Sequence, residues 1–393
     1  MIDFKLSTEQ RARQAMAREF AERHIAPIAA SVDRDQQFPW EVIERGILAG
    51  LTTMMIPAAY GGGGFDHLSV GLVLEELGAA CAGMASIFGA ALLGSAPIVL
   101  LGTEDQKQRL LRRIAEDDSG RYLCAFAVTE AAAGSGAASG DPQFGVQLRA
   151  RRQGDSYILS GSKRFISNGG VARLYSVLAR THPTKPALSG LSFFAVAASD
   201  RLHIGKVEAK MGQCACPTTE LIFDDVAVPA CDLLGREGIG GIGLAETASF
   251  SGPLVSAICV GVARAAVSLA RQHARRGDSP LLDQQGVAMR LFDMATTLEA
   301  ARHLVWRALW ENDQRVNPTT GALRGAPNLR LAAMAKVYAS DACVRLVDDA
   351  VEIIGLEALV GGHPASKLVR DAKLMQIFDG TNQIHRIGTA RLL

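Results

Sequence analysis

The sequence shows little of the charge or metal chemistry that several protein classes need. Its 393 residues carry 41 Lys and Arg against 40 Asp and Glu, a net charge of +1 at pH 7. Nucleic acids and anionic membranes select a strong positive excess, so neither is favoured as a partner. The 7 cysteines and 8 histidines show no metal-ligand spacing, since Cys214 and Cys216 form a single C-x-C with no second pair. We therefore expect no metal site.

Secretion features are also missing. The first residues, MIDFKLSTEQRARQ, are charged and include no apolar core of a signal peptide. An odd number of cysteines without such a signal is typical of a reducing compartment. The sequence therefore predicts a cytoplasmic protein.

One stretch lacks charge altogether. No charged residue occurs between Leu77 and Leu101, which is long enough to cross a bilayer. The stretch is rich in Gly and Ala, which favour insertion much less than Leu, Ile or Phe. We therefore expect buried helices in a large helical domain and no membrane span.

Helical patterns occupy both ends of the chain, and short apolar runs occupy its middle. Ser7 and Gln10 form a capping-box pattern at the start of a helix. Apolar or alternating runs bounded by Gly, Pro, Asn and Asp, typical of strands, lie at 122–128, 157–159, 174–178, 191–196 and 221–223. Helical patterns resume near Gly240, at 253–276, 284–312 and 328–354. We predict a helical domain over 1–118, a β domain over 119–236 and a helical domain over 237–393.

The segment from Arg370 to Arg391 carries the clearest candidate for chemistry. Asp379-Gly380-Thr381 interrupts two helical runs, so a carboxylate lies where the backbone turns sharply. The neighbouring apolar side chains, Ile377 and Phe378, leave this carboxylate poorly solvated. Desolvation raises a carboxyl pKa and makes a better base near neutral pH. The alternative from spacing alone is an ordinary Asp-Gly surface turn at a helix end.

Two further motifs precede it. FAVTEAAAGS, at 126–135, is a strand end followed by Thr and a Gly-Ser turn. Such turns offer backbone N–H groups and hydroxyls to a polar ring or a phosphate, and they also occur in any β domain. GSKRFISN, at 161–168, is a turn that leads into a strand, and Phe165 there is equally compatible with a plain core position.

In this order and spacing, the three motifs resemble those of the acyl-CoA dehydrogenase family over the whole chain. The resemblance implies an α+β, mostly helical fold: an N-terminal helical domain, a middle β-barrel-like domain and a C-terminal four-helix bundle. It implies FAD as cofactor and α,β-dehydrogenation of an acyl thioester. Asp379 stands at the position of the catalytic base, which is Glu in most members.

The resemblance also implies further site residues. Those expected to bind FAD are Phe126, Val128, Thr129, Gly134, Ser135, Phe165, Ser167, Arg275, Thr381 and Gln383. Those expected to contact substrate are Ser135, Phe378, Gly380 and Arg391. Arg275 or Arg276 would reach the FAD of a neighbouring subunit, as the family's Arg does.

Several positions depart from the family pattern. Gly277 replaces a Phe that reaches adenine, and Glu352 replaces a Gln near the pyrophosphate, where a carboxylate is unfavourable unless a cation intervenes. Gly252 replaces an Arg that often lies on the substrate-facing helix. That helix offers no alternative base, since Glu246 lies more than a turn away.

Three functional hypotheses follow from the resemblance. The first is an acyl-CoA dehydrogenase, a homo-oligomer (tetramer or dimer) that passes electrons to an electron-transfer flavoprotein or similar acceptor. Under this first hypothesis, Asp379, which is shorter than the usual Glu, favours a branched, cyclic or α-substituted acyl group. The second is a dehydrogenase of an acyl or peptidyl carrier protein, suggested by Gly252. The third is a non-catalytic or half-competent subunit of a hetero-oligomer, suggested by the weakened adenine contacts.

Overall fold

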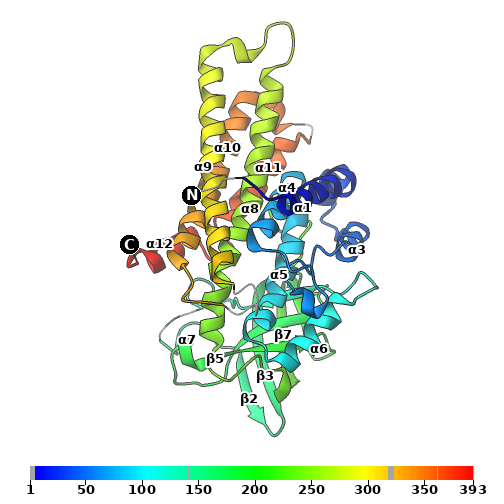
Figure 1. Ribbon diagram of the computed structural model, residues 1–393, viewed down its shortest axis with the longest axis vertical. Helices are drawn as coiled ribbons and strands as arrows, with labels where there is room; N and C mark the ends of the chain where they lie inside the picture. Colours follow the sequence, from blue (N-terminus) through cyan, green and yellow to red (C-terminus); the bar gives the residue numbers. More distant parts are fainter. Residues whose placement is uncertain (1–4, 138, 140, 317–322, 361, 393) are drawn as a thin grey trace.

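The computed structural model describes residues 5–137, 139, 141–316, 323–360 and 362–392. Helices form the upper part of the molecule in Figure 1, and the sheet lies below them. The expected fold class is confirmed, because a curled sheet separates two helical regions along the chain. The boundaries near 118 and 236 stay a prediction.

The N-terminal region is helical throughout. Its α-helices are α1 (Thr8–Phe20), α2 (Ala29–Asp35), α3 (Trp40–Leu48), α4 (His67–Ala80), α5 (Ala82–Leu101) and α6 (Glu104–Ala115). A π-helical turn, η1 (Ala21–Ile25), and a 3-10 turn, η2 (Ala26–Ile28), link α1 to α2, and another 3-10 turn, η3 (Ala58–Tyr60), follows α3. The capping box is confirmed: Ser7 and Gln10 exchange hydrogen bonds of 2.9 and 3.1 Å.

The middle region is one mixed seven-stranded sheet. Its strands are β1 (Cys124–Ala127), β2 (Arg149–Gln153), β3 (Ser156–Ser167), β4 (Leu174–Arg180), β5 (Leu191–Ala197), β6 (Leu202–Val207) and β7 (Thr218–Pro229). A short helix, α7 (Ala187–Gly190), precedes β5, and a 3-10 turn, η4 (Ala230–Asp232), follows β7. The sequence runs predicted five of these strands but not β2 and β6, which are polar and mostly exposed.

Long helices build the C-terminal region. They are α8 (Gly240–Ala274), α9 (Gln285–Arg315), α10 (Leu329–Ile354), α11 (Pro364–Met375) and α12 (Asn382–Ala390), with 3-10 turns η5 (Leu281–Asp283) and η6 (Gly355–Leu359). Helices α8, α9 and α10 pack against one another, and α11 packs on α8 and α10. Helix α8 starts thirteen residues before Pro253, which lies inside it, so proline did not mark the helix start that the 253–276 pattern placed there.

Two helices are apolar and long enough to cross a membrane, α5 and α8. Buried residues make up 67% of the most apolar window of α5 and 72% of that of α8. Both helices belong to the same hydrophobic core, which runs from α1 to α11. Their apolar composition is accounted for by packing within the protein.

Buried charges fasten the two helical regions together. Glu76 on α4 accepts hydrogen bonds from Arg18 on α1 (2.9 Å) and from Arg264 on α8 (2.7 Å). Burial alone would raise the pKa of Glu76, but these two guanidinium groups outweigh it and hold the pKa below its usual value. The adjacent Glu75 pairs with Arg302 on α9 at 3.0 Å. The sequence placed Glu75 and Glu76 beside the uncharged stretch, and here they are paired and buried.

Helix α5 packs closely on the sheet at Gly94. A Cβ atom added there would lie 2.5 Å from the backbone nitrogen of Ala125 and 2.6 Å from Cβ of Cys124, both on β1. The carbonyl oxygen of Gly94 also accepts a 2.6 Å hydrogen bond from Ser176 on β4. This contact sets the distance between the N-terminal helices and the strand that precedes the 126–135 motif.

We predict that Gly94→Ala lowers the free energy of unfolding by about 1–3 kcal/mol, because the methyl group forces backbone apart. Gly286→Ala on α9 is the matched control: its added methyl group meets nothing within 4 Å, so it should be neutral or slightly stabilising. Thermal melting of both variants checks this. A Gly94→Ala protein that melts with the parent would contradict the close approach.

Candidate active site

Asp379 lies in the turn between α11 and α12. Asp379 and Gly380 have φ angles of +55° and +85°, so two successive residues take the left-handed conformation. Such a turn is easy for Gly and tolerable for Asp, whose short side chain is enriched in this region. Thr381 then caps α12, its hydroxyl accepting the backbone N–H of Ile384 at 3.2 Å. The expected break between two helices is confirmed at this point.

The Asp379 carboxylate points toward α8. The hydroxyl of Ser251 lies 3.0 Å from each carboxylate oxygen and donates to them. Burial raises the pKa of Asp379 to about 6, although Lys336 and Ser251 both favour the charged form. The carboxyl group is therefore largely ionised at neutral pH and still binds a proton readily, as a general base must.

The peptide group around Asp379 is held on both sides. Lys336 on α10 donates to the carbonyl oxygen of Gly380 at 2.7 Å. His385 on α12 donates through Nε2 to the carbonyl oxygen of Asp379 at 2.9 Å. Asn382 continues the network, donating to Asp341 on α10 at 2.8 Å. The turn is thus fixed to α10 and to the first turns of α12.

Phe165 is an exposed aromatic ring in a strained position. It lies in the β3–β7 irregularity between Lys163 and Ile166 and has a φ of +60°. Its side chain is 52% exposed although the ring is large and apolar. Left-handed backbone at an aromatic residue costs free energy and is maintained where the surroundings impose it, often at a functional site. A flat, exposed ring of this kind fits a stacking surface for a ligand, and the plain core position is thereby excluded for Phe165.

A buried ion pair joins the 126–135 and 161–168 motifs. Lys163 is completely buried and donates to Glu130 at 2.8 Å and to the carbonyl oxygen of Val128 at 2.9 Å. Burial lowers the pKa of Lys163 to about 8, and Glu130 opposes that shift. One residue further, the backbone N–H of Arg164 donates to Thr129 at 2.8 Å. The ends of the two motifs therefore form one unit.

The terminal turn meets this unit across the domain boundary. The hydroxyls of Ser135 and Thr381 lie 3.4 Å apart. Phe126 on β1, half-buried, stacks on Phe193 with ring centroids 5.6 Å apart. The structure thus brings Phe126, Val128, Thr129, Ser135, Phe165, Phe378, Asp379, Gly380 and Thr381 into neighbouring segments, with Gly134 and Ser167 beside them in the chain.

Among the described residues, three expected site residues are exposed and make no polar contact with the Asp379 turn. Arg275, Gln383 and Arg391 are exposed, and within the described part of the chain none has a hydrogen bond or ion pair with Asp379 or its partners. Arg275 ends α8 at the top of Figure 1, whereas the sheet lies at the bottom.

Two acidic residues singled out in the sequence, Glu352 and Glu246, are paired with arginines. Glu352 binds Arg290 at 2.5 Å, so a cation does lie beside this carboxylate. Glu246 binds Arg315 at 2.9 Å, which removes it as an alternative base. Among the described residues, no three His, Cys, Asp or Glu side chains gather as a metal site.

Sequence reasoning missed Ser251, Lys336 and His385. Lys336 left a signal, because it lies on the same helical face as the apolar residues Ala332 and Ala339. Ser251 left none, since a serine beside the glycine at 252 is compatible with many helices.

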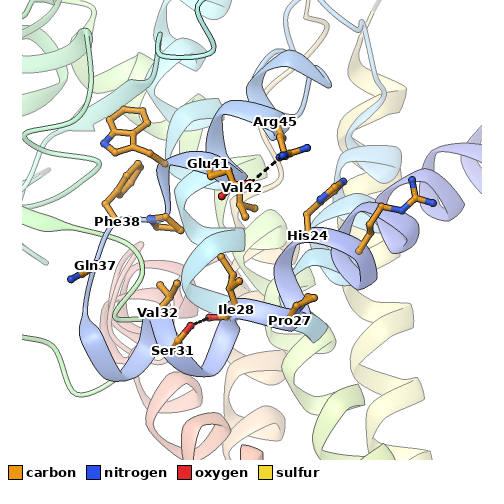
Figure 2. A pocket seen from close by; sticks show the side chains of 13 residues that line it. His24, Pro27, Ile28, Ser31, Val32, Gln37, Phe38, Glu41, Val42 and Arg45 are labelled. Carbon is orange, nitrogen blue, oxygen red and sulfur yellow. Dashed lines mark hydrogen bonds and ion pairs between the residues drawn. The ribbon is translucent and has the colours of Figure 1, made fainter.

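A separate pocket of about 530 Å³ lies in the N-terminal region, between η1, η2, α2 and α3. Figure 2 shows Ile28, Val32 and Phe38 along it, with His24 and Arg45 at one end. None of its lining residues belongs to the three motifs.

Comparisons with known proteins agree with this arrangement. Residues 7–118, 125–226 and 241–393 match the N-terminal, middle and C-terminal domains of acyl-CoA dehydrogenase. Cyclohex-1-ene-1-carbonyl-CoA dehydrogenase of Syntrophus aciditrophicus is 35% identical over 99% of this chain and 91% of its own length. Cyclohexane-1-carbonyl-CoA dehydrogenase of Geobacter metallireducens is 36% identical over 99% of this chain and 98% of its own. The structure of butyryl-CoA dehydrogenase from Megasphaera elsdenii superposes with a TM-score of 0.91, at 34% identity and over 100% of both chains.

The burial of Asp379 predicts a cost in stability. Its folded-state pKa of about 6 exceeds the ordinary 3.8, so the folded protein binds the proton more tightly than the unfolded chain. Stability therefore falls as pH rises between these values. Asp379→Asn should raise the melting temperature near pH 7.5, by the equivalent of up to about 3 kcal/mol, and give no gain below about pH 4.

Asp118→Asn, at an exposed carboxyl group, is the control and should show no such pH-dependent gain. The measurement is thermal melting of the purified protein across this pH range. An Asp379→Asn gain that is the same at every pH would show that the carboxyl group does not titrate differently on folding.

Proposed function

Since this chain belongs to the acyl-CoA dehydrogenase family, we propose that Asp379 is its catalytic base and that its substrate is an alicyclic acyl-CoA. The reaction class is FAD-dependent α,β-dehydrogenation of an acyl thioester. The observation that carries the assignment of Asp379 is its carboxylate, desolvated and held by Ser251, in a turn that touches the 126–135 motif through Thr381.

The residues around this turn fit a flavin. Phe165 offers an exposed aromatic face, and Phe126, Val128 and Thr129 lie along the neighbouring strand end. The hydroxyls of Ser135 and Thr381, with Ser167, provide polar contacts, and Gly134 leaves the loop backbone accessible to a phosphate. The chemistry that FAD supplies is acceptance of the β-hydrogen as hydride.

The chain's own part in the reaction is proton removal and substrate alignment. Asp379 takes the α-proton of the thioester, and its ordinary acidity is weakened by burial so that it accepts that proton near neutral pH. Gly380 and Phe378 border the carboxylate and contact the acyl group. A backbone N–H beside Asp379 polarises the thioester carbonyl, which stabilises the enolate as charge develops.

The length of the base selects the acyl group. Asp is one methylene shorter than the usual Glu, so its carboxylate is set back by about 1.5 Å. A displacement of about 1 Å costs roughly a hundredfold in rate, and an acyl group with bulk at Cα compensates for it. Two full-length relatives named for cyclohexane- and cyclohexenecarbonyl-CoA support a ring as that bulk. Because these relatives use CoA esters, CoA is preferred to a carrier protein.

We predict that Asp379→Asn retains FAD but reduces it with cyclohexanecarbonyl-CoA at least about a thousandfold more slowly, because an amide cannot accept the proton. Asp379→Glu should favour butyryl-CoA over the ring substrate relative to the parent by about tenfold or more. Anaerobic bleaching of the flavin absorbance measures both rates.

Ser249→Ala, two residues before Ser251 on α8, is a control that leaves the carboxylate contact intact, because the Ser249 hydroxyl bonds Glu246 and Asn312 and not Asp379. An unchanged rate in Asp379→Asn would remove Asp379 as the base. Bleaching of the parent only by thioesters on a carrier protein, or no bleaching at all, would favour the second or third hypothesis.

A second part of the proposal concerns assembly. Helix α9 exposes large apolar side chains, among them Met289 (63% exposed), Phe292 (72%) and Trp310 (53%). A surface of this kind is typical of a subunit interface. In a homotetramer, the other copies of this chain would bury these side chains. Arg276 lies 3.6 Å from Glu357, which leaves Arg275 as the cation that reaches a neighbour's FAD. Gln383 on α12 and Arg391 at its C-terminal end are exposed as well.

We place the enzyme in the cytoplasm, with an electron-transfer flavoprotein or similar acceptor.

We predict a homotetramer by light scattering, and a loss of FAD affinity of about 10- to 100-fold in Arg275→Ala, the value of one charge-assisted hydrogen bond. Arg271→Ala, exposed one turn earlier on α8, should keep the parent's affinity. A monomer that retains FAD would contradict this assembly, and a tetramer only with a second, related chain would favour the mixed-subunit alternative.

A further inference from the structure

Lys336 lies inside the helical bundle, directly behind the turn that carries Asp379. Its side chain on α10 is completely buried. The amine donates to the carbonyl oxygen of Gly380 at 2.7 Å and to the side-chain oxygen of Asn382 at 2.8 Å. Both acceptors follow Asp379 within three residues, so the amine fastens this segment to α10.

Burial of this ammonium group costs free energy that its hydrogen-bond partners do not fully offset. Both of its acceptors are uncharged, and a buried charge without a directly paired opposite charge costs several kcal/mol. Burial accordingly lowers the pKa of Lys336 to about 8, and Asp379 is the charge that most opposes this shift. An uncharged donor would hold the same two oxygens at less cost. We therefore infer that the positive charge of Lys336 has a role of its own, which is to stabilise the ionised carboxylate of Asp379.

The neighbouring helix leaves room for this lysine. A Cβ atom added to Gly252 on α8 would lie 3.5 Å from Cβ and 3.6 Å from Cγ of Lys336. A long side chain at position 252 would compete with the lysine stem for this space. The arginine that the family resemblance implies at position 252 is absent, and a cation from α10 occupies the space beside it.

The other titratable groups near this pair are few. Helix α8 provides the Cys259 thiol, and α10 provides Asp341, which is bound by Arg386 of α12 at 2.6 Å. His385 of α12 binds the Asp379 carbonyl, and burial lowers its pKa, so it is neutral near pH 7. Lys336 is thus the cation that acts on Asp379 from within the bundle.

We propose that Lys336 is a positioning residue for the base: its amine fixes the turn that carries Asp379, and its positive charge, supplied from α10 in place of an arginine on α8, favours the ionised carboxylate. This inference rests on the proposed function for the identity of the base. The hydrogen bonds and the charge act on the same segment from one side chain, whereas Ser251 binds the carboxylate of Asp379 itself.

The first experiment needs no substrate. The gain in melting temperature caused by Asp379→Asn is measured against pH in the parent holoenzyme and again in Lys336→Gln. The gain begins near the unfolded-state pKa and levels off at the folded-state pKa, so the pH at which it levels off reports the protonation of Asp379 in the folded protein. Lys336→Gln should move that pH upward by at least about one unit, because the opposing charge is lost. Arg386→Gln, which removes an exposed cation from α12, should leave it unchanged.

The second experiment uses the reaction. Lys336→Gln should shift the pH profile of flavin reduction upward by the same amount, with the rate recovering at high pH. Adding Gly252→Arg to Lys336→Gln returns a cation to α8 and should reverse the shift. If Lys336→Gln does not fold, Lys336→Arg takes its place: the charge is kept, so the profile should stay at the parent's pH while the maximal rate falls.

A pH profile and melting gain in Lys336→Gln that coincide with the parent's would overturn the proposal, as would a shift in Lys336→Arg. In Lys336→Gln, a rate lowered equally at every pH would reduce Lys336 to a structural role and would also overturn the proposal. Failure of the proposed function is separate: the parent would then not be bleached by any acyl-CoA, whereas the melting experiment still decides the role of Lys336.

Discussion

The site depends on keeping one carboxylate desolvated but ionisable. Burial disfavours the charge of Asp379, while Ser251 and Lys336 favour it, and the balance leaves its pKa at about 6. Neither effect is sufficient alone. A fully solvated carboxylate is a weak base, and a buried carboxylate without a nearby cation stays protonated. The packing of α8 and α10 around the turn, including the small Gly252, serves this balance. The backbone is held as firmly as the carboxylate, because both carbonyls of the turn are bound.

Much of the fold was predictable from the sequence because its signals are local. The capping box at Ser7, the Asp-Gly break at 379 and the apolar strand runs depend on neighbouring residues only. Strands β2 and β6 escaped prediction because most of their side chains are polar and exposed, so no apolar run marks them. Strand β6 is a sheet edge, whereas β2 lies between β4 and β3. Pro253 misplaced the start of α8, since a long helix buried on several sides tolerates a proline that an isolated helix would not.

The site was predictable in part for a related reason. Asp379, Phe165 and Ser135, which we propose as site residues, stand in contiguous motifs, so the order of the motifs along the chain was enough to single them out. Ser251 and Lys336 act through contacts between residues 128 and 44 positions apart, which no local pattern encodes. A lysine on an apolar helical face was nevertheless a readable anomaly, because buried amines need a reason. Arg275 illustrates the opposite limit, since the partner that we propose for it belongs to a second copy of the chain.

The 3.4 Å approach of Ser135 and Thr381 has a consequence for how the molecule tolerates an empty cofactor site. These hydroxyls belong to different domains, so a flavin that contacts both, as we propose, bridges the seam between the two domains. By mass action, its binding free energy is then added to the cohesion of the two domains. Loss of cofactor in the cell would weaken that seam as a whole, and proteases or chaperones would recognise the apoprotein by its loosened domain contact rather than by any missing catalytic group.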